Sequence, residues 1–278
     1  QAQVLGERLA AEGERTRADV LITVDAGNLW LATERGVLAP LRSETLDAVV
    51  PGAFRDPEGH WYAITERARV IVRSTERVPA GELSTYEDLA DPKWQGRLCL
   101  RSSRKVYNQS LVAMLIERHG EEHAERIVRG WVGNLAAPPF ADDTLVVNAI
   151  AAGQCDVGIV NTYYYGRLAR DRPGLPVAVF WPNQGEGDSG VHVNVTGAGL
   201  VRHSRQPELA RRFIEWLLSE PAQRQFADID FEFAVRPGVE PNAAVAAWGD
   251  FRADDRNVAE AGRRQAQAVR LMDRAGYR

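Results

Sequence analysis

Three consecutive tyrosines follow a short apolar segment near the middle of the sequence. Tyr163, Tyr164 and Tyr165 come directly after CDVGIVNT, a pattern typical of a buried strand that runs into a helix start. Adjacent residues of a helix diverge by about 100°, so the three rings cannot all face one core. At least one phenol must point to solvent or into a cleft, where it could hydrogen-bond a solute or bind a metal. Aromatic packing is the alternative for such a triplet taken alone.

A cation that binds phenols must be a strong Lewis acid. The pKa of a free tyrosine is about 10, so its hydroxyl keeps the proton at neutral pH unless a highly charged ion displaces it. Ferric iron is hard, triply charged and suited to oxygen donors, whereas calcium and magnesium call for carboxylates and carbonyls. If a metal binds the triplet, Fe(III) is therefore the cation that we expect.

Tyr107 has a similar place in the predicted topology. A strand predicted at 97–100 runs into RSSRKVYNQS, so Tyr107 lies in the loop or helix start after that strand. Ligands of open α/β sheets bind beyond the carboxyl ends of strands, and the triplet also follows such an end. Phenolates of Tyr107, Tyr163 and Tyr164 would cancel the charge of Fe(III), and an uncompensated charge in a closed cleft is costly. Alone, Tyr107 is typical of a packed aromatic at a helix start.

Two arginines lie close to these tyrosines along the chain. Arg167 is four residues after Tyr163 and three after Tyr164, so it shares a helical face with both. Arg101 begins the basic segment RSSRK directly after the predicted strand. Such a loop could hold a carbonate-like or other oxyanion through its backbone N–H groups, or it could be a solvated basic loop.

Arg67 and Arg69 lie on the same side of a predicted strand because side chains alternate along a strand. Either arginine could reach a ligand cleft, or it could pair with Asp25 or Glu66. We therefore include Arg69, with Arg101 and Arg167, among the candidates for contact with an anion or with the metal ligands.

Short strands alternate with helical patterns along the chain, which predicts an α/β fold with mainly parallel sheets. The expected strands lie at 18–25, 61–74, 97–100, 155–160, 177–182 and 192–204. The expected helices lie at 27–38, within 109–118 and 121–134, and at 143–152 and 258–275. A short helix and turn are expected over 84–96, a helix pair over 207–228, and a further helix after Val160 that Asn161 or Thr162 is suited to cap.

The composition is that of an ordinary folded protein. At 278 residues the chain is long enough for two domains. Its net charge of −4 offers no basic excess to neutralise phosphates, which argues against a nucleic-acid partner. No apolar run approaches the ~18–20 residues needed to cross a bilayer, so no membrane span is expected.

The two cysteines, Cys99 and Cys155, each lie in a short apolar segment. They are either two inert buried thiols or a disulfide between neighbouring strands, which an oxidising periplasm would permit. Their spacing does not decide between these possibilities. The absence of a CxxC pair does argue against a structural zinc site.

The sequence offers little support for an enzyme. It contains no GxSxG, HExxH, Walker or GxGxxG motif. His119 and His123 have the spacing of a zinc-binding pair, but Gly120 between them predicts a helix break. Catalysis by a tyrosine acting as acid or base would need a second polarised group beside the phenol, and none is evident. We predict a binding protein that is not an enzyme.

Six segments together are similar to the ferric-ion-binding proteins of bacterial iron ABC importers, and the similarity extends over essentially the whole chain. They are TVDAGNLW (23–30), ERARVIV (66–72), LSTYEDLADPKWQGR (83–97), RSS…YNQS (101–110), CDVGIVNTYYYGRL (155–168) and GAGLVRHS (197–204). The resemblance implies a two-lobed, type II-like periplasmic solute-binding fold with a hinged interlobe cleft. We expect residues 1–68 and 192–278 to form the first lobe and residues 69–191 to form the second.

The resemblance also implies a function and a set of ligands. It implies a monomeric periplasmic protein, with membrane tethering left open, that binds Fe(III) and delivers it to an ABC importer permease. The tyrosines that match the family's motifs are Tyr107, Tyr163 and Tyr164. Arg167 resembles an arginine that lies behind the ligands, and Tyr165 would be a packing residue. The alternative within the same fold is a binder of an oxyanion or of a small organic cation.

The beginning of the sequence departs from the family pattern. Family members start with a strand–helix–strand unit whose first loop supplies a further tyrosine and sometimes a histidine. This sequence starts with QAQVLGERLAAEGE, a pattern that indicates the middle of an amphipathic helix. We therefore expect the residues given to begin after that unit, inside a longer mature protein.

Overall fold

The computed structural model describes residues 2–278 and divides them into two compact units. The first unit comprises Gln1–Glu66, Asn194–Asn242 and Arg256–Arg263. The second comprises Arg67–Val193, Ala243–Asp255 and Arg264–Arg278. All the tyrosines predicted to bind a ligand lie in the second unit.

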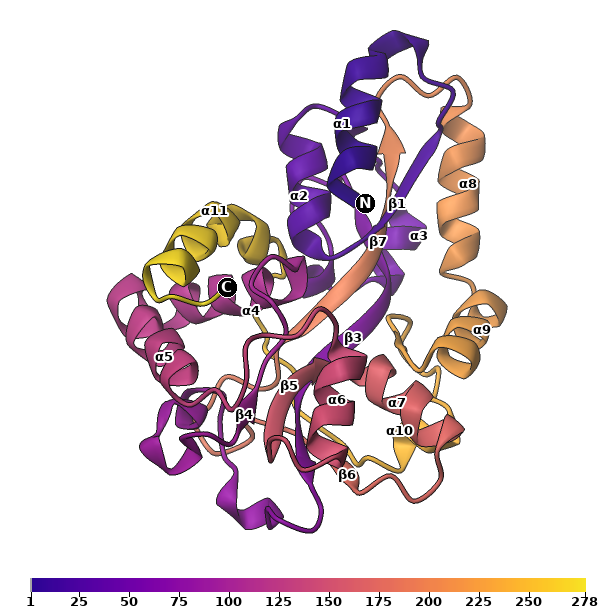
Figure 1. Cartoon of the computed structure of the whole chain (residues 1–278). Coiled ribbons are helices and arrows are strands. Elements are labelled where there is room, and N and C mark those ends of the chain that lie inside the picture. The colour runs from indigo at the N-terminus through magenta and orange to yellow at the C-terminus, as the bar shows by residue number, and fades with distance from the viewer. Residues whose placement is uncertain (1) are drawn as a thin grey trace. The chain divides into compact units, whose positions relative to one another are not determined.

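The first unit contains an antiparallel sheet flanked by helices. Strands β1 (Val20–Val24) and β2 (Leu38–Ala39) both pair with β7 (Val193–Val201), and β8 (Phe233–Ala234) pairs with the beginning of β3 (Tyr62–Ser74). Figure 1 shows α1 (Ala2–Glu12) and α2 (Ala26–Glu34) on one side of β1 and β7, and α8 (Pro207–Leu217) on the other. The unit also contains α3 (Glu44–Val49) and α9 (Glu220–Asp230).

Local sequence signals explain where helices of the first unit begin. Asp25 adopts a positive φ of 75° and accepts a hydrogen bond from Gly27 N, which caps α2. Ser43 caps α3 by accepting from Leu46 N. The inward faces of these helices contribute Leu29 and Leu46 to the hydrophobic core of this unit.

The second unit contains a mixed sheet. The later part of β3 pairs antiparallel with β5 (Val157–Asn161) and β6 (Val177–Phe180), and β4 (Leu98–Cys99) is parallel to β5. The expectation of mainly parallel sheets was wrong, because the long strands β3 and β7 run against the strands that pair with them. The parallel pair β4–β5 is nevertheless the one that matters for the tyrosines, since its two carboxyl ends meet at one edge.

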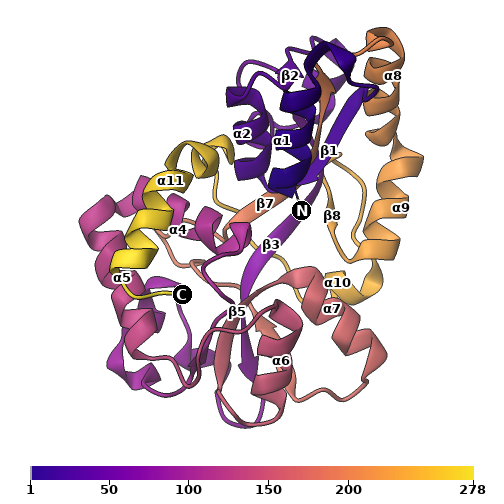
Figure 2. The same ribbon diagram turned by 45° about the horizontal axis from the view of Figure 1, so that its top comes forward.

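Six helices complete the second unit: α4 (Val106–His119), α5 (Glu121–Gly133), α6 (Asp143–Ala151), α7 (Thr162–Asp171), α10 (Ala243–Ala246) and α11 (Ala259–Arg274), which begins in the first unit. Figure 2 shows α6 and α7 beside β5. The short helix and turn expected over 84–96 are two short 3-10 helices, Glu87–Ala90 and Pro92–Trp94. Pro92 explains the interruption, because it disfavours a helical conformation at the residue before it.

Cys99 and Cys155 form a disulfide, with their Cα atoms 6.0 Å apart and a sequence separation of 56. Both side chains are buried. The bond joins β4 to the segment that leads into β5. Of the two possibilities that the sequence left open, the structure contains the disulfide.

The unit boundaries differ from the expected lobes mainly near the C-terminus. The chain passes between units at 66/67 and 193/194, close to the expected 68/69 and 191/192. Residues 243–255 and 264–278, which we expected in the first lobe, lie in the second unit. One physical reason is that the later part of α11 forms ion pairs with α4 and α5, through Arg264 to Glu117 and Arg274 to Glu125.

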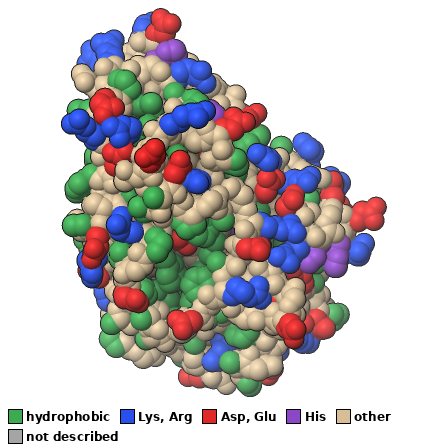
Figure 3. Space-filling model, turned by 180° about the vertical axis from the view of Figure 1, so that it is seen from behind, with side chains coloured by type: hydrophobic (Ala, Val, Ile, Leu, Met, Phe, Trp, Pro, Cys, Tyr) green, Lys and Arg blue, Asp and Glu red, His purple; other side chains and the backbone are tan. Residues whose placement is uncertain are grey.

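The exposed surface carries mixed charge. Acidic and basic side chains are interspersed over the face seen in Figure 3, in agreement with the small net charge of −4. None of the helices within residues 2–278 combines the length and the apolar character that crossing a bilayer requires.

Candidate functional site

Tyr107 and Tyr163 meet at the carboxyl edge of the parallel β4–β5 pair. Tyr107 lies in the first turn of α4 and Tyr163 in the first turn of α7. The Tyr163 hydroxyl donates to the Tyr107 hydroxyl across 3.3 Å, although the two residues are 56 positions apart. Tyr163 is buried and Tyr107 is partly exposed. The structure therefore brings together two phenols that the sequence predicted to share a site.

Tyr164 lies against the same pair. Its ring centroid is 4.5 Å from that of Tyr163, with the planes tilted by 33°. The Tyr164 hydroxyl accepts a hydrogen bond from Arg101 Nη1 at 3.4 Å, and Tyr164 is partly exposed. Tyr107, Tyr163 and Tyr164 are called the tyrosine cluster below.

Tyr165 has different surroundings. Its hydroxyl donates to the Val177 carbonyl at 3.0 Å, and its ring makes an edge contact with Trp248, with 5.6 Å between centroids. Burial raises the pKa of Tyr165. This geometry is that of a packing residue whose proton already has an acceptor.

The seven tyrosines of the chain fall into two groups by what their hydroxyls contact. Four of them donate to main-chain carbonyls, namely Tyr62, Tyr86, Tyr165 and Tyr277. Within the described part of the chain, the hydroxyls of the tyrosine cluster donate to no carbonyl and no carboxylate. The Tyr163 hydroxyl bonds that of Tyr107 and accepts from Asn161, and the Tyr164 hydroxyl accepts from Arg101. A metal could therefore replace the protons of the cluster without leaving a buried acceptor unpaired.

Arginine side chains surround the cluster. The Arg101 guanidinium carbon lies 5.3 Å from the ring centroid of Tyr107 and 5.6 Å from that of Tyr164. Arg67 lies 5.6 Å from the Tyr107 ring centroid, and the exposed Arg167 lies 5.1 Å from that of Tyr163. Three guanidinium groups therefore lie against the rings of the cluster.

Arg69 supports the cluster from behind. This buried side chain donates from Nη1 to Asp143 Oδ2 and Asn161 Oδ1, both at 3.0 Å, and from Nη2 to Asn108 Oδ1 at 2.5 Å. Its partners are therefore neither Asp25 nor Glu66, which the sequence offered as possible ones. Asn108 follows Tyr107 directly, and Asn161 lies two residues before Tyr163. Arg69 therefore links the two segments that carry these tyrosines.

Asp143 lies between two of these arginines. Its carboxylate is fully buried; Oδ2 accepts from Arg69 Nη1 and from Asn161 N, and Oδ1 lies 3.5 Å from Arg101 Nη1. The contribution of Asp143 was missed in the sequence, where it looked like an ordinary helix-start residue. Nothing local to ADDTL indicates that this carboxylate faces two arginines from other elements.

Asn161 also has a role that the sequence did not indicate. It occupies the cap position of α7, as predicted, but its side chain makes no capping hydrogen bond. Instead Oδ1 accepts from Arg69, and Nδ2 donates to the Tyr163 hydroxyl at 3.4 Å. The VNT segment that resembles the family motif was the available signal.

Burial is the main influence on the proton of Tyr163. It raises the pKa of the phenol far above the ordinary value, and the neighbouring phenols of Tyr107 and Tyr164 raise it further, while Arg67 lowers it. Tyr163 therefore keeps its proton at neutral pH until a cation displaces it.

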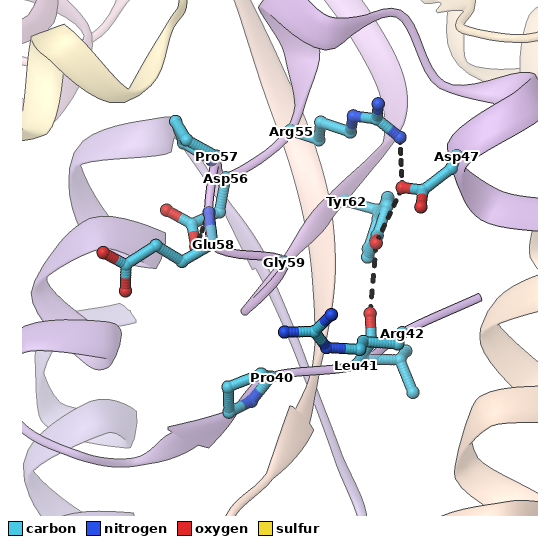
Figure 4. A pocket seen from close by; sticks show the side chains of 10 residues that line it. All are labelled: Pro40, Leu41, Arg42, Asp47, Arg55, Asp56, Pro57, Glu58, Gly59 and Tyr62. Atoms are coloured by element: carbon cyan, nitrogen blue, oxygen red, sulfur yellow. Dashed lines mark hydrogen bonds and ion pairs between the residues drawn. The ribbon is translucent and has the colours of Figure 1, made fainter. Parts of the chain in front are cut away.

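Other candidates are separate from the tyrosine cluster. In residues 2–278, no three His, Cys, Asp or Glu side chains gather as a metal-binding group. Helix α4 ends at His119 and Gly120 interrupts the helical run, as predicted; His119 contacts Glu87 at 2.7 Å. A pocket of about 500 Å³ in the first unit contains Tyr62 and the ion pair between Arg55 and Asp47 (Figure 4), and none of the predicted ligands.

Comparison with known proteins agrees with the resemblance seen in the sequence. Residues 16–252 match the sequence profile of a family described as bacterial extracellular solute-binding protein. Iron uptake protein A2 of Synechocystis sp. is 44% identical over 99% of this chain and 82% of its own length.

Solved structures agree with this result. FutA (IdiA) of Trichodesmium, described in complex with iron and citrate ligands, has a TM-score of 0.96 at 43% identity over 100% of this chain and 89% of that one. The Bordetella ferric binding protein has a TM-score of 0.90 at 39% identity, over 98% and 88% of the two chains. The predicted resemblance to ferric-ion-binding proteins and the two-lobed solute-binding fold are confirmed.

Proposed function

Because the chain belongs to the family of bacterial extracellular solute-binding proteins, we propose that it binds ferric iron and delivers it to an ABC-type membrane permease. The phenolates of Tyr107, Tyr163 and Tyr164 are the proposed ligands. The protein acts as a monomer without catalysis, outside the cytoplasmic membrane, where the buried disulfide fits an oxidising compartment.

One observation carries this proposal: three phenols converge whose hydroxyls donate to no carbonyl or carboxylate in the described part of the chain. The other four tyrosines each donate to a main-chain carbonyl. Replacing the protons of the cluster by Fe(III) yields a neutral set of one trivalent ion and three phenolates. Such compensation lowers the cost of placing the ion beside the buried Tyr163.

The surrounding charges support an additional anion. Arg101 lies against the rings of Tyr107 and Tyr164, and the exposed Arg167 lies against the ring of Tyr163. Guanidinium groups are well suited to donate hydrogen bonds to a planar oxyanion. A carbonate-like anion that completes the iron coordination would accept such bonds. Arg101 and Arg167 are the proposed contacts for it, with Arg69 holding the ligand-bearing segments in place.

The names of the relatives support iron as the ion that this protein binds. Iron uptake protein A2 of Synechocystis and the Bordetella ferric binding protein are both named for iron, and the Trichodesmium structure is described with iron and citrate. None of these three names refers to an organic cation or to an oxyanion as the transported solute.

The test is the visible charge-transfer band that phenolate ligands give with ferric iron. We expect the wild-type protein to acquire this band on loading and the Tyr163→Phe plus Tyr164→Phe variant to lose it, with iron affinity reduced by more than about a hundredfold, since even outer contacts of metal ligands are worth ~10–100-fold. Tyr165→Phe is the matched control, because it removes a neighbouring hydroxyl that donates to Val177, and it should keep both band and affinity.

An unchanged band and affinity in the double variant would show that the tyrosine cluster is not the iron site. A colourless wild-type protein whose thermal midpoint rises with an oxyanion but not with ferric iron would instead support the alternative solute.

A further inference from the structure

The last two residues of the chain contact the segment that leads into Tyr107. Tyr277 is 2% exposed, and its hydroxyl donates to the Arg101 carbonyl at 2.5 Å. Ser103 N donates to the Arg278 carbonyl at 3.2 Å. The Arg101 carbonyl also accepts from Asn108 Nδ2 at 2.7 Å. It is thus held from two sides, by the chain end and by the residue next to Tyr107.

The sequence RAGYR explains why Tyr277 has a defined position. Gly276 adopts a positive φ of 76°, which ends α11. Gly276 N donates to the Asp273 carbonyl and Tyr277 N donates to the Met272 carbonyl, the two hydrogen bonds of a Schellman motif. These bonds fix the backbone that leads into Tyr277, whose side chain is buried.

Helix α11 contacts the same region at a second point. Gln265 Nε2 donates to Gln109 Oε1 at 3.1 Å, and Gln109 lies two residues after Tyr107 in α4. Arg264 and Arg274 add ion pairs to Glu117 of α4 and Glu125 of α5. These contacts anchor the helix to the elements that carry Tyr107, so the chain end and the Tyr107 segment form one packed group.

We propose, on the basis of the iron site proposed above, that Tyr277 is a positioning residue for that site. Its hydroxyl holds the Arg101–Tyr107 segment so that the Tyr107 phenol and the Arg101 guanidinium meet Tyr163 and Tyr164. Tyr107 comes from a different segment from the other two ligands, and a metal site tolerates displacements of only about 0.5 Å. A hydrogen bond that fixes this segment therefore contributes to metal affinity without touching the metal.

Tyr277→Phe tests the proposal, because it removes the hydroxyl and keeps the buried ring. We expect iron affinity to fall about tenfold, at the lower end of the ~10–100-fold range for contacts behind metal ligands, and the charge-transfer band to shift. Deletion of residues 277–278 should cause a larger loss. In the iron-free protein, amide hydrogen exchange across residues 101–108 should become faster in Tyr277→Phe.

Tyr62→Phe is the matched control, since it also removes a buried tyrosine hydroxyl bonded to a main-chain carbonyl, but in the first unit. It should lower stability to a similar extent and leave the band, the affinity and the exchange of 101–108 unchanged. A purely structural role for Tyr277 would make the two variants behave alike.

Failure of this inference is distinguishable from failure of the proposed function. Wild-type affinity in Tyr277→Phe overturns the inference, whether or not exchange becomes faster. If the wild-type protein itself acquires no band, the proposed function fails, and hydrogen exchange decides the positioning claim by itself: faster exchange in 101–108 supports it, and unchanged exchange overturns it.

Discussion

Tyr62 in the first unit and Tyr163 in the second are both buried tyrosines with raised pKa values, yet their hydroxyls have opposite surroundings. Tyr62 donates to the Leu41 carbonyl and to Asp47 Oδ1, each at 3.1 Å (Figure 4). Tyr163 contacts the Tyr107 hydroxyl and receives a hydrogen bond from Asn161. Burial alone therefore does not distinguish a proposed ligand from a structural tyrosine. What separates the two residues is whether the proton is needed by a carbonyl or carboxylate oxygen.

The charged groups beside the two tyrosines differ as well. Burial and then the hydrogen bond to Asp47 raise the pKa of Tyr62 to about 12, and the carboxylate would repel a phenolate. The tyrosine cluster instead has the guanidinium groups of Arg67 and Arg101 beside its rings. Burial raises the pKa of both phenols, but Tyr62 donates to a carboxylate whereas Arg67 lowers the pKa of Tyr163, which fits the proposal that Tyr163 binds iron as phenolate.

The largest expected effect is on the pH dependence of iron binding. The pKa of Tyr163 is raised, so the phenol is protonated at neutral pH and iron must displace that proton. Affinity should therefore fall as pH falls, by up to about tenfold per pH unit for each proton released. Competition titrations between pH 6 and 8 measure this slope.

A matched pair of variants isolates the contribution of one phenol to this slope. Tyr163→Phe should release about one proton fewer than the wild type, and Tyr62→Phe should release the wild-type number. Equal slopes in wild type and Tyr163→Phe would mean that Tyr163 does not bind iron as phenolate.

A smaller effect is expected from Arg101→Gln. The substitution removes a cation that donates to the Tyr164 hydroxyl and lies beside the Tyr107 ring, so a contact behind two proposed ligands is lost and iron affinity at pH 7 should fall about tenfold. Isothermal titration with a chelated ferric donor measures the change. Arg104→Gln, in the same basic segment but exposed, should bind like the wild type. An Arg101 variant that binds iron more tightly would show that the cation repels iron more than it favours phenolate.

The smallest effect is expected from Tyr62→Phe. It removes one buried hydroxyl that donates to Leu41 and Asp47, which should lower the free energy of unfolding by about 1 kcal/mol. Urea denaturation of the iron-free protein measures this loss. Iron affinity should stay at the wild-type value, and a weakened affinity would contradict the contrast between the two tyrosines.

Much of the fold could be predicted because its elements carry local signals. The apolar run before Asn161 became β5, and Pro207 begins α8 as expected. Pairing directions could not be predicted in the same way, since they depend on how β3 and β7 run beside strands distant in sequence. The C-terminal helix was predicted, but its later part packs with the second unit through side-chain pairs such as Arg264–Glu117, which no local pattern indicates.

The candidate site was predictable where a motif carried it. Tyr107, Tyr163 and Tyr164 come together as expected, and their role as iron ligands remains a proposal. Asp143 and Tyr277 were not predicted as parts of the site, because each reaches it from an element distant in sequence. A buried carboxylate between two arginines is recognisable only after the elements are placed in space.

The disulfide between Cys99 and Cys155 has a consequence for how the protein can be made and handled. Both sulfurs are buried, so a reductant can attack the bond only in molecules that have opened. Mild reducing agents should leave folded protein intact for long periods, while chains synthesised in a reducing cytoplasm would fold around two free thiols. Recombinant material from the two compartments would then be chemically different proteins with the same sequence, and preparations are comparable only after a thiol count.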